Sequence, residues 1–426
     1  MVAKLKDYNP EDTKFWETKG KKIAYTNLWI SIPNLTLAFI VWYIFSAVIV
    51  NLNKVGYNLT PSQILNLIAL PGLFGATLRI AYGFLNPVFG GRNFTTFATL
   101  TLIIPAIGIG VIAQDPNTPY SILVLLAILS GFGCANFSSS NANIPAFFPK
   151  HKQGSALGLN AGIGNLGVSV VQFSTPLLIG TSIFSFMFGA PQITADGKEL
   201  YLQNAAFFWV IPLIIFAALA YFKMNNLESK DTPKFTEQLF IFKRKHTYAI
   251  MILYLMTFGG FAGFAGAFPA FLSFKFPHIN PLSVAFIGPL IGALLRPIGG
   301  ALSDKIGGSK ITLLVFIGVG ASLYGLTVID TLVPFVITFA ILFAFLGIGN
   351  GSTFGIIAEV FNPKEKGAAV GFIAAIGAYG AFIIPKVFGY SMEATGDIKL
   401  GFYIIFGFNL VCLLITYFGY IMKKSK

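Results

Sequence analysis

Twelve long apolar stretches, separated by short polar segments, constrain this chain more than any other feature of its sequence. The hydrocarbon core of a bilayer is about 30 Å thick, so a helix that crosses it needs about 20 apolar residues. Only 11% of the residues are charged, whereas soluble domains carry about 25%. A soluble fold is therefore excluded, and we predict an all-α membrane protein. The predicted spans are 29–52, 62–86, 95–114, 120–147, 155–185, 203–223, 247–273, 282–302, 310–329, 333–360, 368–391 and 400–421.

The basic residues lie mainly on one side of the predicted membrane. The net charge is +13, and 22 of the 29 Lys and Arg residues fall on the side that carries both termini. Lys54, Lys198, Lys275 and Lys399 fall on the other side. Such an excess marks the cytoplasmic face. We therefore expect a multi-pass protein of the cytoplasmic (inner) membrane, with both termini in the cytoplasm, a lipid bilayer around it and no nucleic-acid partner.

The two halves of the chain repeat each other. Residues 75–79 (Gly-Ala-Thr-Leu-Arg) match residues 292–296 (Gly-Ala-Leu-Leu-Arg), and a glycine pair follows each arginine at the same distance. Four glycines between 154 and 167 match four glycines between 367 and 380. Parallel repeats of six helices, with cargo held between them, are typical of major facilitator transporters. The predicted parts are a cytoplasmic arm (1–28), a six-helix bundle (29–223), a cytoplasmic linker (224–246), a second six-helix bundle (247–421) and a cytoplasmic tail (422–426).

One loop resembles a motif of the major facilitator superfamily. Residues 299–308, Gly-Gly-Ala-Leu-Ser-Asp-Lys-Ile-Gly-Gly, are similar to its loop between helices 8 and 9. The equivalent loop, 83–92, keeps its glycines and Arg92 but has Asn86-Pro87 where an acid is usual. This departure puts in doubt the usual charge-relay role of that loop and leaves the predicted fold unchanged: twelve transmembrane helices in two pseudo-symmetric bundles.

Two arginines lie inside the predicted spans at equivalent positions. Arg79 and Arg296 each stand about seven residues from the cytoplasmic end of a helix, roughly 10 Å deep. A charge near the bilayer centre costs about 2.5 kcal/mol or more, so such residues usually mark a pathway. The alternative is that each side chain reaches back to the headgroups. Helical side chains lean toward the N-terminus of their helix. Because both helices begin at the outer face, we expect both guanidinium groups to point toward the midplane.

The sequence places no Asp, Glu or His at the depth of these arginines. Glu359, close to the end of its span, is the one acid inside a predicted helix. Two buried cations without a carboxylate are costly, so we expect the cargo to supply the negative charge. The planar fork of arginine suits a flat oxyanion, to which it donates paired hydrogen bonds. Nitrate and nitrite have this shape, and so do formate, oxalate and other carboxylates.

Several motifs then resemble the nitrate/nitrite porter family. They cover nearly the whole chain and are most specific in helices 4, 5 and 11. In helix 5, residues 158–169 read Gly-Leu-Asn-Ala-Gly-Ile-Gly-Asn-Leu-Gly-Val-Ser, similar to the nitrate signature of that family. Residues 371–386 are similar to its sister signature in helix 11, and residues 131–150 and 15–31 are also similar to the family. The resemblance implies a secondary transporter of nitrate and nitrite.

The resemblance also implies roles for six residues. Arg79 and Arg296 would clamp the anion, Asn165 and Tyr254 would add hydrogen bonds, and Phe137 and Phe258 would cover its flat faces. Read without the family, both phenylalanines are equally well explained as packing residues among the 45 in the chain, and Asn165 as a hydrogen-bonding group between helices.

Paired glycines in helices 5 and 11 call for an explanation, since glycine costs a helix interior about 1 kcal/mol. One explanation is close contact between helices. The other is gating, in which smooth surfaces let the halves move past each other during alternating access. The candidate gating residues are Gly158, Gly164, Gly167, Gly371, Gly377 and Gly380.

We expect exchange of nitrate for nitrite, because an empty site would have to reorient with two charged arginines. Proton-coupled nitrate uptake is the alternative; it needs a protonatable group such as Tyr254 or Glu359, and Glu359 is equally a candidate for a salt bridge at the cytoplasmic gate. Motifs of membrane enzymes are absent from the sequence, so we expect no enzymatic activity, no cofactor and no metal. We expect a monomer that serves nitrate assimilation. Sequence leaves open the preference between the two anions, the stoichiometry and the oligomeric state.

Overall fold

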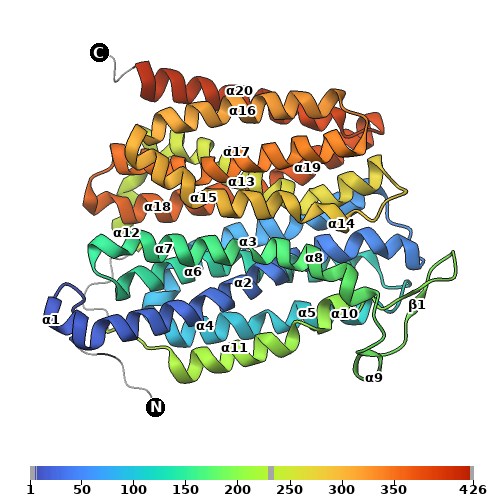
Figure 1. The fold of residues 1–426 in the computed structure, drawn as a ribbon, viewed down its shortest axis with the longest axis horizontal. Coiled ribbons are helices and arrows are strands. Elements are labelled where there is room, and N and C mark those ends of the chain that lie inside the picture. Colours follow the sequence, from blue (N-terminus) through green and yellow to red (C-terminus); the bar gives the residue numbers. More distant parts are fainter. Residues whose placement is uncertain (1–4, 6, 229–234, 423–426) are drawn as a thin grey trace. The chain divides into compact units, whose positions relative to one another are not determined.

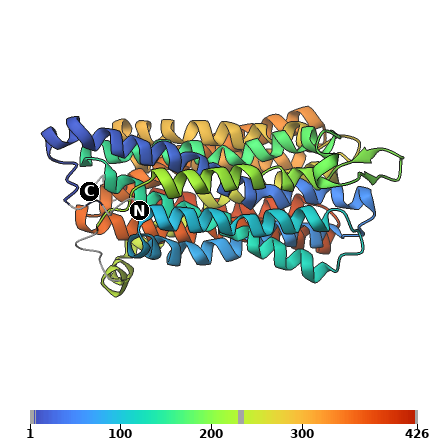
Figure 2. The same cartoon turned by 90° about the horizontal axis from the view of Figure 1, so that it is seen from below.

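The computed structural model describes residue 5 and residues 7–228 and 235–422. Long helices dominate it, running side by side within each part of the chain (Figures 1 and 2). The elements up to residue 223 are α1 (Thr13–Phe15), η1 (Trp16–Gly20), α2 (Lys21–Leu52), η2 (Asn53–Val55), α3 (Pro61–Phe89), α4 (Gly91–Thr101), α5 (Ile103–Ile112), α6 (Tyr120–Asn143), η3 (Ile144–Phe147), α7 (Lys150–Asn165), α8 (Gly167–Ile179), α9 (Ser185–Phe188), β1 (Gln192–Ile193), β2 (Glu199–Leu200), α10 (Asn204–Phe207) and α11 (Val210–Lys223).

The second half contains helices alone among its described residues. These are α12 (Phe235–Gln238), η4 (Leu239–Lys243), α13 (Lys245–Lys275), α14 (Leu282–Ala285), α15 (Ile287–Ile306), α16 (Gly308–Val328), α17 (Leu332–Val360), α18 (Pro363–Ala378), α19 (Gly380–Thr395), α20 (Lys399–Thr416) and η5 (Tyr417–Ile421). The two short strands of the first half pair antiparallel, Gln192 with Leu200, in the loop between α9 and α10.

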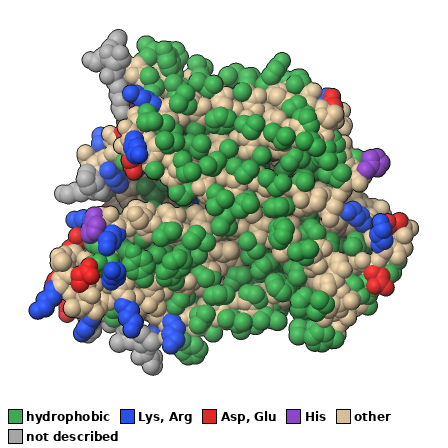
Figure 3. Space-filling view, viewed as in Figure 1, with side chains coloured by type: hydrophobic (Ala, Val, Ile, Leu, Met, Phe, Trp, Pro, Cys, Tyr) green, Lys and Arg blue, Asp and Glu red, His purple; other side chains and the backbone are tan. Residues whose placement is uncertain are grey.

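Twelve helical stretches within the described residues are long and apolar enough to cross a membrane. They confirm the twelve predicted spans, and several begin or end a few residues away from the prediction. The first runs from Thr13 to Val55 and so includes half of the expected polar arm. The fifth, Lys150–Ile179, ends before the predicted residue 185, because residues 180–184 form a turn ahead of α9. Hydrophobic side chains cover much of the surface along the helices, and Lys and Arg gather near helix ends (Figure 3).

Contacts divide the chain into two compact units. The first contains the residues up to Val48 and Phe74–Glu237; the second contains Ile49–Leu73 and the residues from Gln238 onward. The second unit therefore includes the beginning of α3, although the sequence repeat assigns that helix to the first six.

Backbone geometry repeats at the two offsets seen in the sequence. Gly90 and Gly307, which are 217 residues apart, precede α4 and α16 with φ of 85° and 104°. Leu166 and Tyr379, 213 residues apart, interrupt the fifth and eleventh spans with almost the same dihedrals, −61° and −19° against −61° and −18°. The positive φ favours glycine at both turns. The repeat is thus present in local conformation as well as in residue type.

Candidate functional site

Arg79 is held in the first unit where α3 comes very close to α6. A Cβ at Gly75, one turn before Arg79, would lie 2.2 Å from the Cβ of Cys134, so only glycine permits this approach. The Arg79 side chain is 1% exposed, and its Nε donates to the carbonyl oxygen of Cys134 at 3.0 Å. Its guanidinium carbon lies 4.6 Å from the centre of the Phe137 ring and 5.8 Å from that of Trp42. The structure therefore brings together two of the predicted site residues, Arg79 and Phe137.

Arg296 occupies a similar environment in the second unit, on α15. Its side chain is 8% exposed, and its Nη2 donates to the hydroxyl of Tyr254 at 3.4 Å. The rings of Phe258 and Phe354 each have their centre 5.9 Å from its guanidinium carbon. Tyr254 stacks on both rings, at centroid distances of 5.4 Å and 4.8 Å. Arg296, Tyr254 and Phe258 thus form one cluster, as the family resemblance implies.

The partners found for both guanidinium groups are neutral. A carbonyl oxygen, a phenol and aromatic rings orient a cation and attract it through dipoles and ring quadrupoles, but they add no negative charge. Such a site keeps its positive potential and can attract an anion.

Asn165 is the last residue of α7, directly before the interruption at Leu166. Its side chain is fully buried, and its amide nitrogen and oxygen have no hydrogen-bond partner among the described residues. Burying an amide in this state costs about 1–3 kcal/mol. The predicted role of Asn165, a hydrogen bond to the cargo, would remove this cost.

The six candidate gating glycines fall into two groups. A Cβ at Gly167 would lie 2.3 Å from the carbonyl oxygen of Thr36 on α2, and one at Gly380 would lie 2.3 Å from the Cα of Gly259 on α13. Gly164 and Gly377 likewise meet side chains, of Leu35 and Tyr254, within 2.6 Å. At Gly158 and Gly371, in contrast, a Cβ would meet no described atom within 4 Å. Close helix contact explains the first four; a gating role stays a prediction, and Gly158 and Gly371 are its better candidates.

Glu359 caps the N-terminus of α16. Its Oε1 accepts hydrogen bonds from the backbone N–H groups of Gly308 at 2.6 Å and Ser309 at 3.4 Å, and its Oε2 accepts one from the Ser309 hydroxyl at 3.2 Å. A carboxylate at a helix N-terminus is stabilised by the helix dipole and by these N–H groups. This capping contact was not foreseen from the sequence, which suggested a gate salt bridge or a proton carrier.

The described residues contain no group of three or more His, Cys, Asp or Glu side chains that could hold a metal ion. Cys134 and Cys412 are both buried and free of disulfide bonds.

The chain resembles known transporters over most of its length. The sequence profile described as Major Facilitator Superfamily matches residues 23–359. The chain is 45% identical to the nitrate/nitrite transporter NarU of Escherichia coli (strain K12), over 99% of this chain and 96% of that protein. The chain belongs to the nitrate/nitrite transporters of the Major Facilitator Superfamily. It is also 40% identical to the probable nitrate/nitrite antiporter NarK2 of Thermus thermophilus, over 99% of this chain and 97% of that protein.

Solved structures of other major facilitator proteins have the same fold. A D-xylose–proton symporter has a TM-score of 0.71 with 15% identity, covering 93% of this chain and 97% of its own. A bacterial homologue of the human lysosomal transporter Spinster, in an inward-facing and occupied conformation, has a TM-score of 0.70 with 13% identity, covering 93% of this chain and 96% of its own. These findings confirm the predicted fold class and family.

Sequence reasoning missed three residues of interest in this transporter. Phe354 stands 217 residues after Phe137, the same offset that relates the two arginines, so the repeat itself could have identified it. Trp42 had no such signal. Lys386 lies inside the eleventh span, and it is the remaining cation once the arginines and the lysines near helix ends have been assigned.

Proposed function

We propose that this protein exchanges nitrate for nitrite across the cytoplasmic membrane by alternating access. The observation that carries the proposal is the pair of buried arginines, one in each unit. They are related by the sequence repeat, and each lies against a phenylalanine that the same repeat relates. The names of the relatives support the choice of anions, since NarU of E. coli is named a nitrate/nitrite transporter and NarK2 of T. thermophilus a probable antiporter.

Arg79 and Arg296 bind the anion in this proposal. Each guanidinium offers a planar fork to the oxygens of nitrate or nitrite. The hydroxyl of Tyr254, which already contacts Arg296, and the buried amide of Asn165 donate further hydrogen bonds. Phe137 and Phe258 keep the anion flat and exclude water, which strengthens each of these electrostatic contacts.

Exchange follows from the cost of reorienting an empty site. Two buried cations of like charge oppose closure of the path around them, and a bound anion reduces that penalty. Reorientation is therefore faster with nitrate or nitrite bound than without. The protein acts as a monomer in this scheme, because one chain carries both halves of the repeat, and it lies in the membrane with both termini in the cytoplasm.

The test uses purified protein in vesicles at fixed pH without a proton gradient. Vesicles loaded with nitrite are given labelled nitrate outside, and matched vesicles contain no nitrite. We expect nitrate uptake that depends on internal nitrite. Uptake that needs a proton gradient and ignores internal nitrite would instead establish proton-coupled symport. Binding of formate or oxalate in competition with nitrate measures how far the site selects among planar anions.

A further inference from the structure

Lys386 is a third cation within the spans, and the proposed function does not use it. It lies in α19, inside the span Glu365–Thr395, nine residues before its end and thus about 14 Å along the helix from it. An ionisable residue at such a position is costly unless it pairs or faces water, and it usually marks the path of an ion. The side chain is exposed and therefore accessible to a ligand.

Lys386 belongs to a close antiparallel contact between the beginning of α3 and α19, both in the second unit. Its Nζ donates to Oδ1 of Asn66 at 3.1 Å, and the hydroxyl of Ser62 donates to Glu393. A Cβ at Gly72 would lie 2.7 Å from the carbonyl carbon of Ala381, and one at Gly389 would lie 3.7 Å from the Cβ of Leu65. These eight residues, Ser62, Leu65, Asn66, Gly72, Ala381, Lys386, Gly389 and Glu393, are called the α3–α19 seam.

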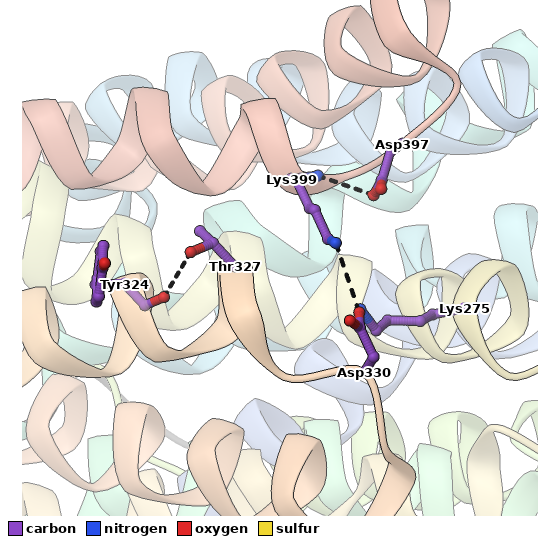
Figure 4. Close-up of polar contacts among 6 residues, drawn as sticks. All are labelled: Lys275, Tyr324, Thr327, Asp330, Asp397 and Lys399. Carbon is purple, nitrogen blue, oxygen red and sulfur yellow. Dashed lines mark hydrogen bonds and ion pairs between the residues drawn. The ribbon is translucent and has the colours of Figure 1, made fainter.

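Other lysines at this end of the second unit are neutralised. Lys275 donates to Asp330 at 2.7 Å, and Lys399 lies 3.6 Å from the same carboxylate (Figure 4). The hydrogen bond from Lys275 lowers the pKa of Asp330 below its usual value, so the carboxylate is ionised at neutral pH.

Lys386 differs from both, since no carboxylate among the described residues lies within 4 Å of its ammonium. Its one hydrogen bond goes to a neutral amide. An ammonium has three donors, so two remain for a ligand.

The seam lies next to the face of α3 that carries Arg79. Leu65, Gly72 and Arg79 are spaced by seven residues and so share one face of the helix. Arg79 follows Gly72 by about 10 Å along the axis and Asn66 by about 20 Å. An anion that moves along this face from the beginning of α3 therefore passes the level of Lys386 before it reaches Arg79.

We infer that Lys386 is a recruiting site for small monovalent oxyanions on the outer side of the arginine pair. When the seam opens, its ammonium exchanges Asn66 for nitrate or nitrite and holds the anion briefly before the arginines bind it. A lysine suits this step because a single flexible point charge binds an oxyanion more loosely than the arginine fork does. The inference rests on the proposed function, which names the cargo and the orientation.

The test compares the two membrane faces. Nitrate uptake is measured in right-side-out and in inverted membrane vesicles with Lys386→Gln, Lys386→Arg and, as a control, Lys399→Gln. Charges that attract an ion speed its arrival by tenfold or more at low salt and lose this effect as salt increases. Lys386→Gln is therefore expected to raise the KM for nitrate about fivefold from the outer face alone and to remove the salt dependence of that KM. Lys386→Arg and Lys399→Gln should resemble the unaltered protein.

A second variant separates the charge from the hydrogen bond. Asn66→Ala removes the acceptor and keeps the cation, so the outer KM should stay the same or fall. The inference is overturned if Lys386→Gln leaves the outer KM unchanged, if it raises the KM equally from both faces, or if Asn66→Ala raises the outer KM as much as Lys386→Gln does. Failure of the proposed function has a different signature, because Arg79→Lys and Arg296→Lys would then transport nitrate normally whatever Lys386 does.

Discussion

At the scale of single residues, both buried arginines are oriented by neutral groups. Arg79 is fixed through its Nε by a carbonyl oxygen, and Arg296 through Nη2 by the hydroxyl of Tyr254. Aromatic rings within 6 Å of each guanidinium carbon add a favourable interaction with the cation. These contacts hold the forks in place without cancelling their charge, which is the property that an anion site requires.

Replacing either arginine by lysine should abolish most nitrate binding. Lysine keeps the charge but loses the paired hydrogen bonds, so we expect Arg79→Lys and Arg296→Lys each to weaken binding by about tenfold or more. Isothermal titration of purified protein measures the effect. Arg244→Lys is the matched control, because Arg244 pairs with Glu365 at an exposed position. Binding as tight as in the unaltered protein for both buried positions would disprove the clamp.

Tyr254→Phe tests the hydroxyl separately from the ring. The substitution keeps the stack with Phe258 and Phe354 and removes the oxygen that accepts from Arg296. A hydrogen bond to a charged group contributes about 1.5–3 kcal/mol, so we expect nitrate affinity to fall by about tenfold. The same variant also examines proton coupling: nitrite-dependent nitrate exchange that persists at the same pH optimum would exclude Tyr254 as an essential proton carrier.

At the scale of helices, the fifth and eleventh spans are built alike. Each is interrupted once, at Leu166 or Tyr379, with the same backbone dihedrals. On both sides of each interruption a glycine packs tightly against a neighbouring helix of the same unit. The glycine pairs therefore serve close packing next to the interruptions, whereas Gly158 and Gly371, nearer the beginning of α7 and α18, have open space around them.

Alanine substitutions should separate these two groups of glycines. Gly167→Ala and Gly380→Ala place a methyl group against backbone atoms, and such overpacking costs about 1–3 kcal/mol. We expect both to lower the thermal unfolding temperature in detergent. Gly158→Ala and Gly371→Ala should fold normally, since alanine favours a helix, yet reduce the exchange rate if these positions must slide past other groups. An unchanged rate in the second pair would remove the gating role.

Glu359 acts at the level of a helix end, and its protonation can be tested directly. The amide of Glu359→Gln still accepts the hydrogen bond from Gly308 but cannot carry a proton. We expect this variant to fold and to exchange nitrate for nitrite with an unchanged pH profile. Glu359→Ala loses the cap and should lower stability by about 1 kcal/mol. Loss of exchange in Glu359→Gln, with folding intact, would support the proton-coupled alternative.

At the scale of the whole molecule, each compact unit supplies one arginine with its aromatic neighbours. One element is shared, because α3 begins in the second unit and continues in the first. The helix that carries Arg79 is thus also the helix that forms the α3–α19 seam. Any change in the seam is transmitted along a continuous helix to the arginine, which gives a physical route by which opening on one side can be coupled to the anion.

The orientation of the whole chain is predicted by the distribution of its basic residues. Lys198→Cys lies in the exposed loop between β1 and β2, and Lys243→Cys lies exposed at the end of η4. In intact cells a membrane-impermeant thiol reagent should label Lys198→Cys and spare Lys243→Cys, and in inverted vesicles the pattern should reverse. Both natural cysteines are buried, so background labelling should be low. Labelling of Lys243→Cys in intact cells would reverse the proposed orientation.

The sequence by itself determined the twelve spans, the repeat and the two arginines inside the apolar segments. These are properties of length, composition and spacing, which a bilayer and a helix impose locally on the chain. Only the tertiary structure decided which of the 45 phenylalanines lie against each arginine, which glycines pack between helices, and that Lys386 meets Asn66. Those facts depend on contacts between residues far apart in the chain, and many apolar side chains satisfy the same hydrophobic pattern equally well.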